Sequence, residues 1–187
     1  KDAIAPHQSD KVPVFLDGET SVADSWAIAN YLEDTYPDRP SLFGGEGGRA
    51  MGRMLNWWGD TVVIGGMFPM IVKDIHDHLR PADQAYFRKT REARLGKTLE
   101  DAGANRDEAV EGFRAALNPM RLTLKTQPYI GGASPNYADY IVFGPFQWAR
   151  AISDFKLLKE DDPVYAWREK LLDAFGRMAR KSPGYAV

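Results

Sequence analysis

The spacing of apolar and polar residues divides the chain into a short part with strand patterns and a longer part with helical patterns. Residues 14–16 form a short apolar run, and Asp17-Gly18 directly after it is a strong turn signal. The sequence therefore predicts a small hairpin that returns over residues 19–22. A helix is expected over residues 23–35, because apolar side chains recur there at helical spacing and Pro37 follows.

The pattern changes after the glycine-rich segment PSLFGGEGGRA, which predicts a linker. No convincing strand pattern follows it. Helices are expected over about residues 50–63, with a weak point at Gly65-Gly66, and over about 68–79, 81–95, 106–125, 137–152 and 164–180.

The helix expected over residues 106–125 has the most regular pattern, and Pro119 within it predicts a kink. The helix over residues 137–152 is nearly free of charge, so it should be buried on most sides. The apolar stripe of the helix expected over residues 106–125 consists of Val110, Phe113, Leu117, Met120 and Leu124.

Composition indicates an ordinary globular protein and narrows the chemistry. The chain has 187 residues, 44% of them hydrophobic and 27% charged, with a net charge of −2, so nothing favours a nucleic-acid partner. Cysteine is absent, which excludes disulfides and cysteine-ligated zinc within this chain and fits a reducing cytoplasm. No apolar run approaches the length of a membrane span. The opening KDAIAPHQSD lacks an initiator Met and a signal-peptide pattern, which suggests a processed or partial chain.

The dipeptide Val12-Pro13 precedes the first predicted strand and allows two interpretations. A cis bond there would leave the Val12 backbone outside the sheet, where it could pair with an extended peptide ligand. The alternative is an ordinary trans proline that begins a strand, and the dipeptide alone favours this alternative.

The pair Asp24-Ser25 at the start of the first helix also allows two interpretations of equal weight. The helix N-terminus and the serine hydroxyl suit a ligand carboxylate, while the aspartate suits an ammonium group. Together they would hold the two charged groups on the α-carbon of an amino acid. The alternative is purely structural, because Ser21 and Asp24 have the spacing of a capping box.

The order of these features resembles the glutathione transferases over nearly the whole chain. The resemblance implies an α+β, thioredoxin-like N-terminal part, incomplete here, followed by an all-α helical-bundle domain. The implied boundaries are residues 1–42 for the glutathione-binding part, 43–48 for the linker and 49–187 for the helical domain. It also implies a cis proline, with glutathione as the co-substrate held by Lys11, Val12, Pro13, Asp24 and Ser25.

The resemblance assigns a role to each of these residues. The Val12 backbone would pair with the cysteinyl part of glutathione, and Ser25 with Asp24 would hold its γ-glutamyl end. Lys11 is placed for the glycyl carboxylate. In the helical domain, PNYADYIVF resembles the family's capping motif, so Asn136 and Asp139 are expected to be folding residues, not catalytic ones.

The implied activity is attack of the glutathione thiolate on a hydrophobic electrophile by a cytoplasmic homodimer. Two segments, LGKTLEDAGANRDEAVEGFRAALNPMR and DDPVYAWREKLLDAF, are most similar to the bacterial and fungal β-etherase-like branch, which implies aryl-ether cleavage. The family's catalytic residue belongs to a strand-helix-strand segment expected ahead of Lys1, so no catalytic residue is assigned. The alternatives are a non-catalytic binding protein of the same architecture and a peroxide-reducing or disulfide-exchanging enzyme with an upstream cysteine.

Two further groups of residues have candidate roles. Asn56, Trp57 and Trp58 lie on the first helix of the helical domain, where the resemblance implies a pocket for the second substrate. Core or interface packing is an equally good explanation for either tryptophan. Asp74 and His78 are four residues apart on a predicted helix, but no third ligand is evident, so no metal site is expected.

Overall fold

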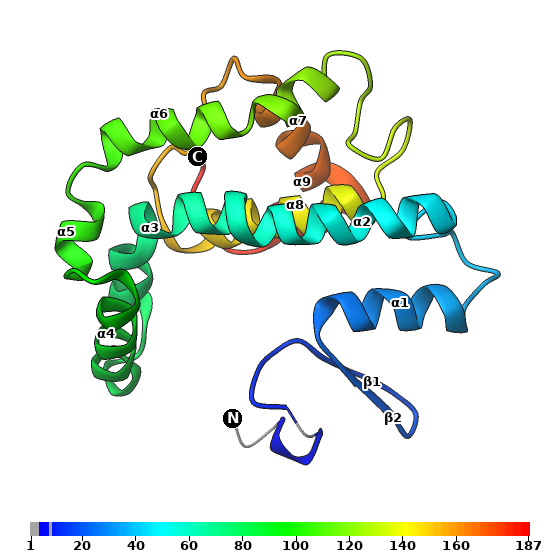
Figure 1. Ribbon diagram of the computed structural model, residues 1–187, viewed down its shortest axis with the longest axis horizontal. Coiled ribbons are helices and arrows are strands. Elements are labelled where there is room, and N and C mark those ends of the chain that lie inside the picture. The colour runs from blue at the N-terminus through cyan, green and yellow to red at the C-terminus, as the bar shows by residue number, and fades with distance from the viewer. Residues whose placement is uncertain (1–3, 8) are drawn as a thin grey trace.

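The computed structural model describes residues 4–7 and 9–187, which form a small hairpin-and-helix part and a larger helical part (Figure 1). The helical part matches the prediction that no further strand follows the glycine-rich segment. The first part consists of η1 (Ala5–His7), β1 (Val14–Asp17), β2 (Thr20–Ala23) and α1 (Ser25–Thr35). The second consists of α2 (Glu46–Trp58), the π-helix η2 (Gly59–Ile64), α3 (Gly65–His78), α4 (Pro81–Leu95), α5 (Leu99–Gly103), α6 (Arg106–Ala116), α7 (Asn118–Thr123), α8 (Tyr137–Ile152) and α9 (Pro163–Lys181).

The predicted hairpin is confirmed, with its turn one residue later than expected. β1 and β2 pair antiparallel in a register that aligns Val14 with Ala23 and Asp17 with Thr20. Asp17 is therefore the last residue of its strand, and the turn is Gly18-Glu19, with Gly18 at a φ of 57°. A β-branched residue would be strained at this φ, which explains the glycine. The Asp17 carboxylate also accepts a hydrogen bond of 3.0 Å from Tyr31, which holds the hairpin against α1.

The glycine-rich segment is not a linker throughout, because α2 begins within it. Gly47 and Gly48 belong to the first turn of this helix. A Cβ atom on Gly48 would lie only 1.9 Å from the Phe43 carbonyl oxygen, so a glycine is required by this close approach. The composition of the segment therefore reflects backbone packing at the start of α2 as much as flexibility.

The expected weak point at Gly65-Gly66 is wrong, because α2, η2 and α3 follow one another without a break from Glu46 to His78. Figure 1 shows α2 running nearly horizontally across the molecule into α3, whose last turns bend downward beside α4. A Cβ on Gly66 would lie 2.9 Å from the ring of Phe113 on α6. The small residue thus permits close helix packing instead of interrupting the helix.

The helix expected over residues 106–125 is split in two instead of kinked. α6 ends at Ala116 and α7 begins at Asn118, with Pro119 in the first turn of α7. Proline lacks the N–H that a continuing helix needs but is well tolerated in a first turn. The apolar stripe expected over residues 106–125 is confirmed as core, since Val110, Phe113, Leu117 and Met120 are buried.

The main core lies between α3, α6, α8 and α9, as the apolar character of the helix over residues 137–152 predicts. α8 has the predicted bounds, and its Phe146 is 1% exposed. Trp167 from α9 packs edge-on against this ring at 6.2 Å. α9 is regular up to Asp173, and residues 174–177 leave the helical conformation before the last turns.

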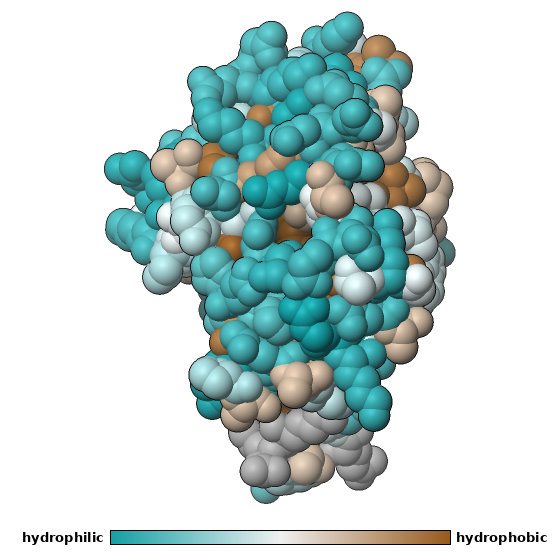
Figure 2. Space-filling view, turned by 90° about the vertical axis from the view of Figure 1, so that its left-hand side faces the viewer, coloured by the Kyte–Doolittle hydropathy of each residue, from teal (hydrophilic) through white to brown (hydrophobic). Residues whose placement is uncertain are grey.

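A second, smaller apolar cluster joins the two parts of the molecule. In it, Ala29 of α1 packs with Phe43 of the connection and Tyr137 at the start of α8. In Figure 1, the hairpin and α1 lie below α2, while α6 and α7 lie above it. The side of the molecule seen in Figure 2, toward α4 and α5, is mostly hydrophilic, with small scattered apolar patches.

Candidate functional site

The hairpin register brings the two predicted parts of the ligand cradle together. Because Val14 pairs with Ala23, the Val12-Pro13 dipeptide lies opposite Asp24-Ser25. The Asp24 N–H donates a hydrogen bond of 3.2 Å to the Pro13 carbonyl oxygen. We call Lys11, Val12, Pro13, Asp24 and Ser25 the cradle.

On the strand side of the cradle, the Val12-Pro13 peptide bond is cis, whereas the dipeptide alone favours trans. The Val12 side chain is 77% exposed. Within residues 4–7 and 9–187, neither its N–H nor its C=O forms a hydrogen bond. Both backbone groups are therefore accessible to an extended ligand.

Lys11, the remaining strand-side residue, is held by a local turn. The Ser9 hydroxyl donates to the Lys11 carbonyl oxygen at 2.7 Å and accepts from the Lys11 N–H at 3.2 Å. The Lys11 residue is exposed, and its ammonium forms no ion pair within the described part of the chain. Its side chain thus remains available to an anion at this end of the cradle.

On the helix side of the cradle, Asp24 is the N-cap of α1. One carboxylate oxygen, Oδ1, accepts hydrogen bonds of 3.0 Å from the N–H groups of both Trp26 and Ala27. The expected Ser21–Asp24 capping box is therefore wrong, because Ser21 lies in β2 and the helix begins after Asp24, not before it.

The second Asp24 oxygen, Oδ2, has no hydrogen-bond partner among residues 4–7 and 9–187. The residue is exposed, and its backbone has a φ of 81°, a conformation that residues other than glycine rarely adopt. Such strain is concentrated at functional sites. Ser25, the first residue of α1, is also exposed beside it. This end of the helix therefore presents a hydroxyl and a carboxylate oxygen to solvent, beside the positive end of the helix dipole.

A buried polar chain connects the cradle to the helical part. The Tyr137 hydroxyl donates a hydrogen bond of 2.8 Å to Asn56 Oδ1, and Asn56 Nδ2 donates to Asp60 at 3.2 Å. Burial is the main cause that raises the pKa of the Tyr137 phenol to about 12; the Asp24 charge contributes to this rise, and hydrogen bonding with Ser25 opposes it. Tyr137 therefore stays neutral and bridges α8, α2 and the start of α1.

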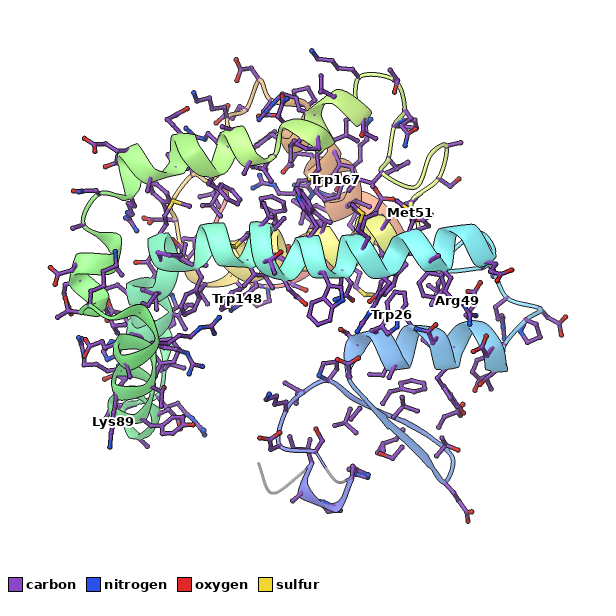
Figure 3. All side chains as sticks on the ribbon, viewed as in Figure 1. Trp26, Arg49, Met51, Lys89, Trp148 and Trp167 are labelled. Atoms are coloured by element: carbon purple, nitrogen blue, oxygen red, sulfur yellow. The ribbon has the colours of Figure 1, made fainter. Side chains whose placement is uncertain are left out.

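The aromatic residues of α1 and α2 form a wall next to the cradle. Trp26 packs edge-on against Tyr137 at 5.5 Å. The Arg53 guanidinium lies 5.1 Å from the Trp26 ring centroid and 4.7 Å from that of Trp57. Figure 3 shows Trp26 in the space between α1 and α2. Sequence reasoning missed Arg53, although the four-residue spacing of Arg53 and Trp57 on one helix signals such a stack.

The three residues predicted to line the second-substrate pocket have different surroundings. Asn56 is buried and occupied by its hydrogen bonds, whereas Trp57 is 54% exposed beneath Arg53. Trp58 packs against the main core and borders a cavity of about 330 Å³ together with Met54 and Met120. Only Trp57 thus combines exposure with a position near the cradle.

The predicted cap of α8 has the expected structural role. The Asn136 side chain accepts a hydrogen bond of 2.9 Å from the Ala138 N–H, and Asp139 completes the capping box.

Asp74 and His78 do not form a common metal site, since the Asp74 carboxylate binds Arg106 and Ser153. No group of three or more potential ligands for a metal occurs in the described residues. Among these residues, no helix has the length and apolar character that a membrane crossing requires.

A comparison with known protein families assigns the chain. The family model described as "Glutathione S-transferase, C-terminal domain" matches residues 50–174, more than half of the chain. The chain belongs to this family. The cap of α8 and the helices α3, α6 and α8 of the main core all lie within the matched segment.

Among curated proteins, the glutathione S-transferase-like protein ustS of Aspergillus flavus is 26% identical over 156 residues. The match covers 75% of this chain and 54% of ustS, so the chain spans about half the length of this relative.

Two solved structures of the family resemble the chain. The glutathione transferase GSTFuA3 from Phanerochaete chrysosporium is 30% identical with a TM-score of 0.75, over 86% of this chain and 68% of that one. The glutathione S-transferase CsGST83044 of Ceriporiopsis subvermispora, solved in complex with glutathione, is 28% identical with a TM-score of 0.63, over 91% and 68% of the two chains. The predicted fold class is confirmed: a thioredoxin-like α+β part precedes the helical domain of a glutathione transferase.

Proposed function

We propose that this protein is a glutathione transferase whose cradle binds glutathione as a co-substrate. The observation that carries the proposal is the arrangement of polar groups at the N-terminus of α1. There, Asp24 uses one carboxylate oxygen to cap the helix and presents the other to solvent beside Ser25 and the accessible Val12 backbone. The family assignment and the glutathione complex of CsGST83044 support it.

Each charged or polar group of glutathione has a chemically matched partner in the cradle. The γ-glutamyl carboxylate suits the N-terminus of α1 and the Ser25 hydroxyl, and the α-ammonium suits Asp24 Oδ2. The cysteinyl backbone suits the Val12 N–H and C=O, and the glycyl carboxylate suits Lys11. Holding the tripeptide in one orientation would place its sulfur for attack on an electrophile.

The reaction we propose is nucleophilic attack of the glutathione thiolate on a hydrophobic electrophile, in a β-etherase-like enzyme that cleaves aryl ethers. The exposed aromatic face of Trp57 suits such a substrate. No residue of the chain is assigned to thiol activation, because Ser9 holds the Lys11 turn and Ser25 has the γ-glutamyl role. We place the glutathione-binding part in residues 1–42 and the helical domain from α2 onward, so that the linker is shortened to residues 43–45, in a cytoplasmic protein.

The test is titration of the full-length protein with glutathione by calorimetry. Ser25→Ala should weaken binding about tenfold, because one hydrogen bond to a charged group is lost. Ser21→Ala is the matched control, since Ser21 is an exposed serine of the same hairpin but lies in β2. Equal affinities of wild type and Ser25→Ala would contradict the assignment of the cradle. Glutathione binding without thioether formation from any electrophile would indicate a binding protein instead.

We also infer a homodimer. Two large apolar side chains three residues apart on α2 are highly exposed, Met51 at 57% and Met54 at 56%, and α7 exposes Leu122 at 54%. Exposed apolar side chains on one helix face are typical of interfaces. Sedimentation of the wild type should give a dimer, and Met54→Glu should shift it toward the monomer. A monomeric wild type at micromolar concentration would contradict the inference.

A further inference from the structure

Arg53 has surroundings that are unusual for a surface arginine. Its guanidinium lies over two indole rings, that of Trp26 on α1 and that of Trp57 four residues later on α2. Contact with both rings restricts the rotamers of the side chain. The N–H groups of the guanidinium remain as potential donors to a ligand.

These N–H groups have no acceptor in the part of the chain that the structure describes. Within residues 4–7 and 9–187, Arg53 forms no ion pair and no hydrogen bond. Arg49, one turn earlier on the same helix, provides the contrast. It also lies over an aromatic ring, that of Phe43 at 5.6 Å, but its guanidinium is paired with Asp34. Figure 3 shows Arg49 with Trp26 between α1 and α2.

The position of Arg53 relates it to the cradle. Trp26 directly follows Ser25 at the start of α1 and packs edge-on against Tyr137. The positive charge of Arg53 lowers the pKa of the Tyr137 phenol while the Asp24 charge raises it, so both charges act at the same end of α1. An anion bound to Arg53 would therefore lie next to Trp57 and next to Trp26, the residue that follows Ser25 of the cradle.

The geometry points to Arg53 as the receptor for a carboxylate on an aromatic second substrate, whose ring would pack against Trp57. A planar guanidinium binds a carboxylate with two parallel hydrogen bonds, which an ammonium does not reproduce. This inference rests on the proposed function, because it selects among electrophiles presented to bound glutathione. It narrows them to aromatic compounds that carry an anionic carboxylate.

The experiment uses the full-length protein and three probes: glutathione, 2-naphthoate and its neutral counterpart 2-naphthamide. Each is titrated by calorimetry, and the two naphthalene compounds also in the presence of saturating glutathione. Wild type should bind the naphthoate more tightly than the amide. Arg53→Gln should weaken naphthoate binding about tenfold, the effect of a lost charge-assisted hydrogen bond. It should leave the affinities for naphthamide and glutathione unchanged.

Two further variants separate geometry from charge. Arg53→Lys keeps the charge but loses the fork of N–H donors, so naphthoate binding should remain weakened. Arg49→Gln is the matched control and should bind all three probes like wild type, because the Arg49 guanidinium already binds Asp34.

Several results would overturn the inference. They are equal affinity of wild type for naphthoate and naphthamide, equal losses in Arg53→Gln and Arg49→Gln, or a loss in Arg53→Gln for glutathione instead of naphthoate. Failure of wild type to bind glutathione, with Arg53-dependent naphthoate binding intact, would refute the proposed function and leave the carboxylate receptor standing. Absence of all binding would refute both.

Discussion

Among the helix N-termini that carry an aspartate, those of α1 and α8 have carboxylates with opposite surroundings. Asp139, in the first turn of α8, is fully buried and accepts four hydrogen bonds. Its Oδ1 receives the Ile130 N–H and the Trp167 indole N–H, both at 2.7 Å. Asp24, at the start of α1, is exposed, and among the described residues only one of its oxygens accepts hydrogen bonds.

The difference indicates how the same residue type serves folding in one place and binding in the other. A buried carboxylate has to be fully hydrogen-bonded, since each missing partner leaves a desolvated charge without compensation. Asp139 therefore fixes the loop before α8 and the position of α9, and it has no capacity left for a ligand. Asp24 retains an oxygen in contact with solvent, and its backbone has a φ of 81° that serves no evident packing purpose.

The largest effect is expected from Asp139→Ala. Four donors would lose their acceptor inside the protein, so the free energy of unfolding should fall by at least about 3 kcal/mol. Chemical denaturation measures this loss. Where the variant still folds, its affinity for glutathione should equal that of wild type. Asn136→Ala removes only one capping contact and should cost about 1 kcal/mol, which provides a folded comparison. Equal losses of stability and affinity would contradict the separation of roles.

A smaller effect is expected from Gly48→Ala, in the first turn of α2. The new Cβ would lie 1.9 Å from the Phe43 carbonyl oxygen, so the backbone has to move and the free energy of unfolding should fall by about 1–3 kcal/mol. Gly47→Ala is the control in the same turn. Its Cβ would meet nothing within 4 Å, and the variant should be more stable by about 1 kcal/mol, because alanine is the better helix former. Thermal melts of the two variants that shift in the same direction would contradict this explanation.

The smallest effect is expected from Tyr137→Phe, which removes the bridge to Asn56. Stability near neutral pH should fall by about 1 kcal/mol, because the buried Asn56 oxygen loses its donor. The folded-state pKa of Tyr137 is raised to about 12 from 10.0, so its stabilising contribution is complete below about pH 10 and is lost between pH 10 and 12. Stability measured from pH 9 to 12 should therefore decline more steeply for wild type than for the variant. Parallel profiles would show that Tyr137 does not carry this dependence.

The sequence predicted the hairpin, the bounds of α8 and its cap because each depends on local signals. The turn signal Asp17-Gly18, one residue ahead of the observed turn, and the pattern of Asn136 with Asp139 are each recognised within a few residues. The family resemblance then selected the glutathione interpretation of Asp24-Ser25, which the residues alone left undecided.

Other features depend on contacts between distant segments and were missed. The role of Gly66 depends on the ring of Phe113. Whether Trp57 or Trp58 is exposed depends on which elements cover each face of α2. The capping box, one of the two interpretations of Asp24, was wrong because the helix start was expected two residues too early. Arg53 was overlooked because its significance lies in Trp26, which comes from another helix.

Calorimetric titration of Asp24→Asn with glutathione tests the central claim most directly. Asparagine is an equally good N-cap and tolerates positive φ better than most residues, so the variant changes the charge and keeps the cap. The account predicts a melting temperature close to that of wild type and a glutathione affinity at least about tenfold weaker, from loss of the ammonium contact. An unchanged affinity would show that Asp24, like Asp139, serves only to hold its helix in place.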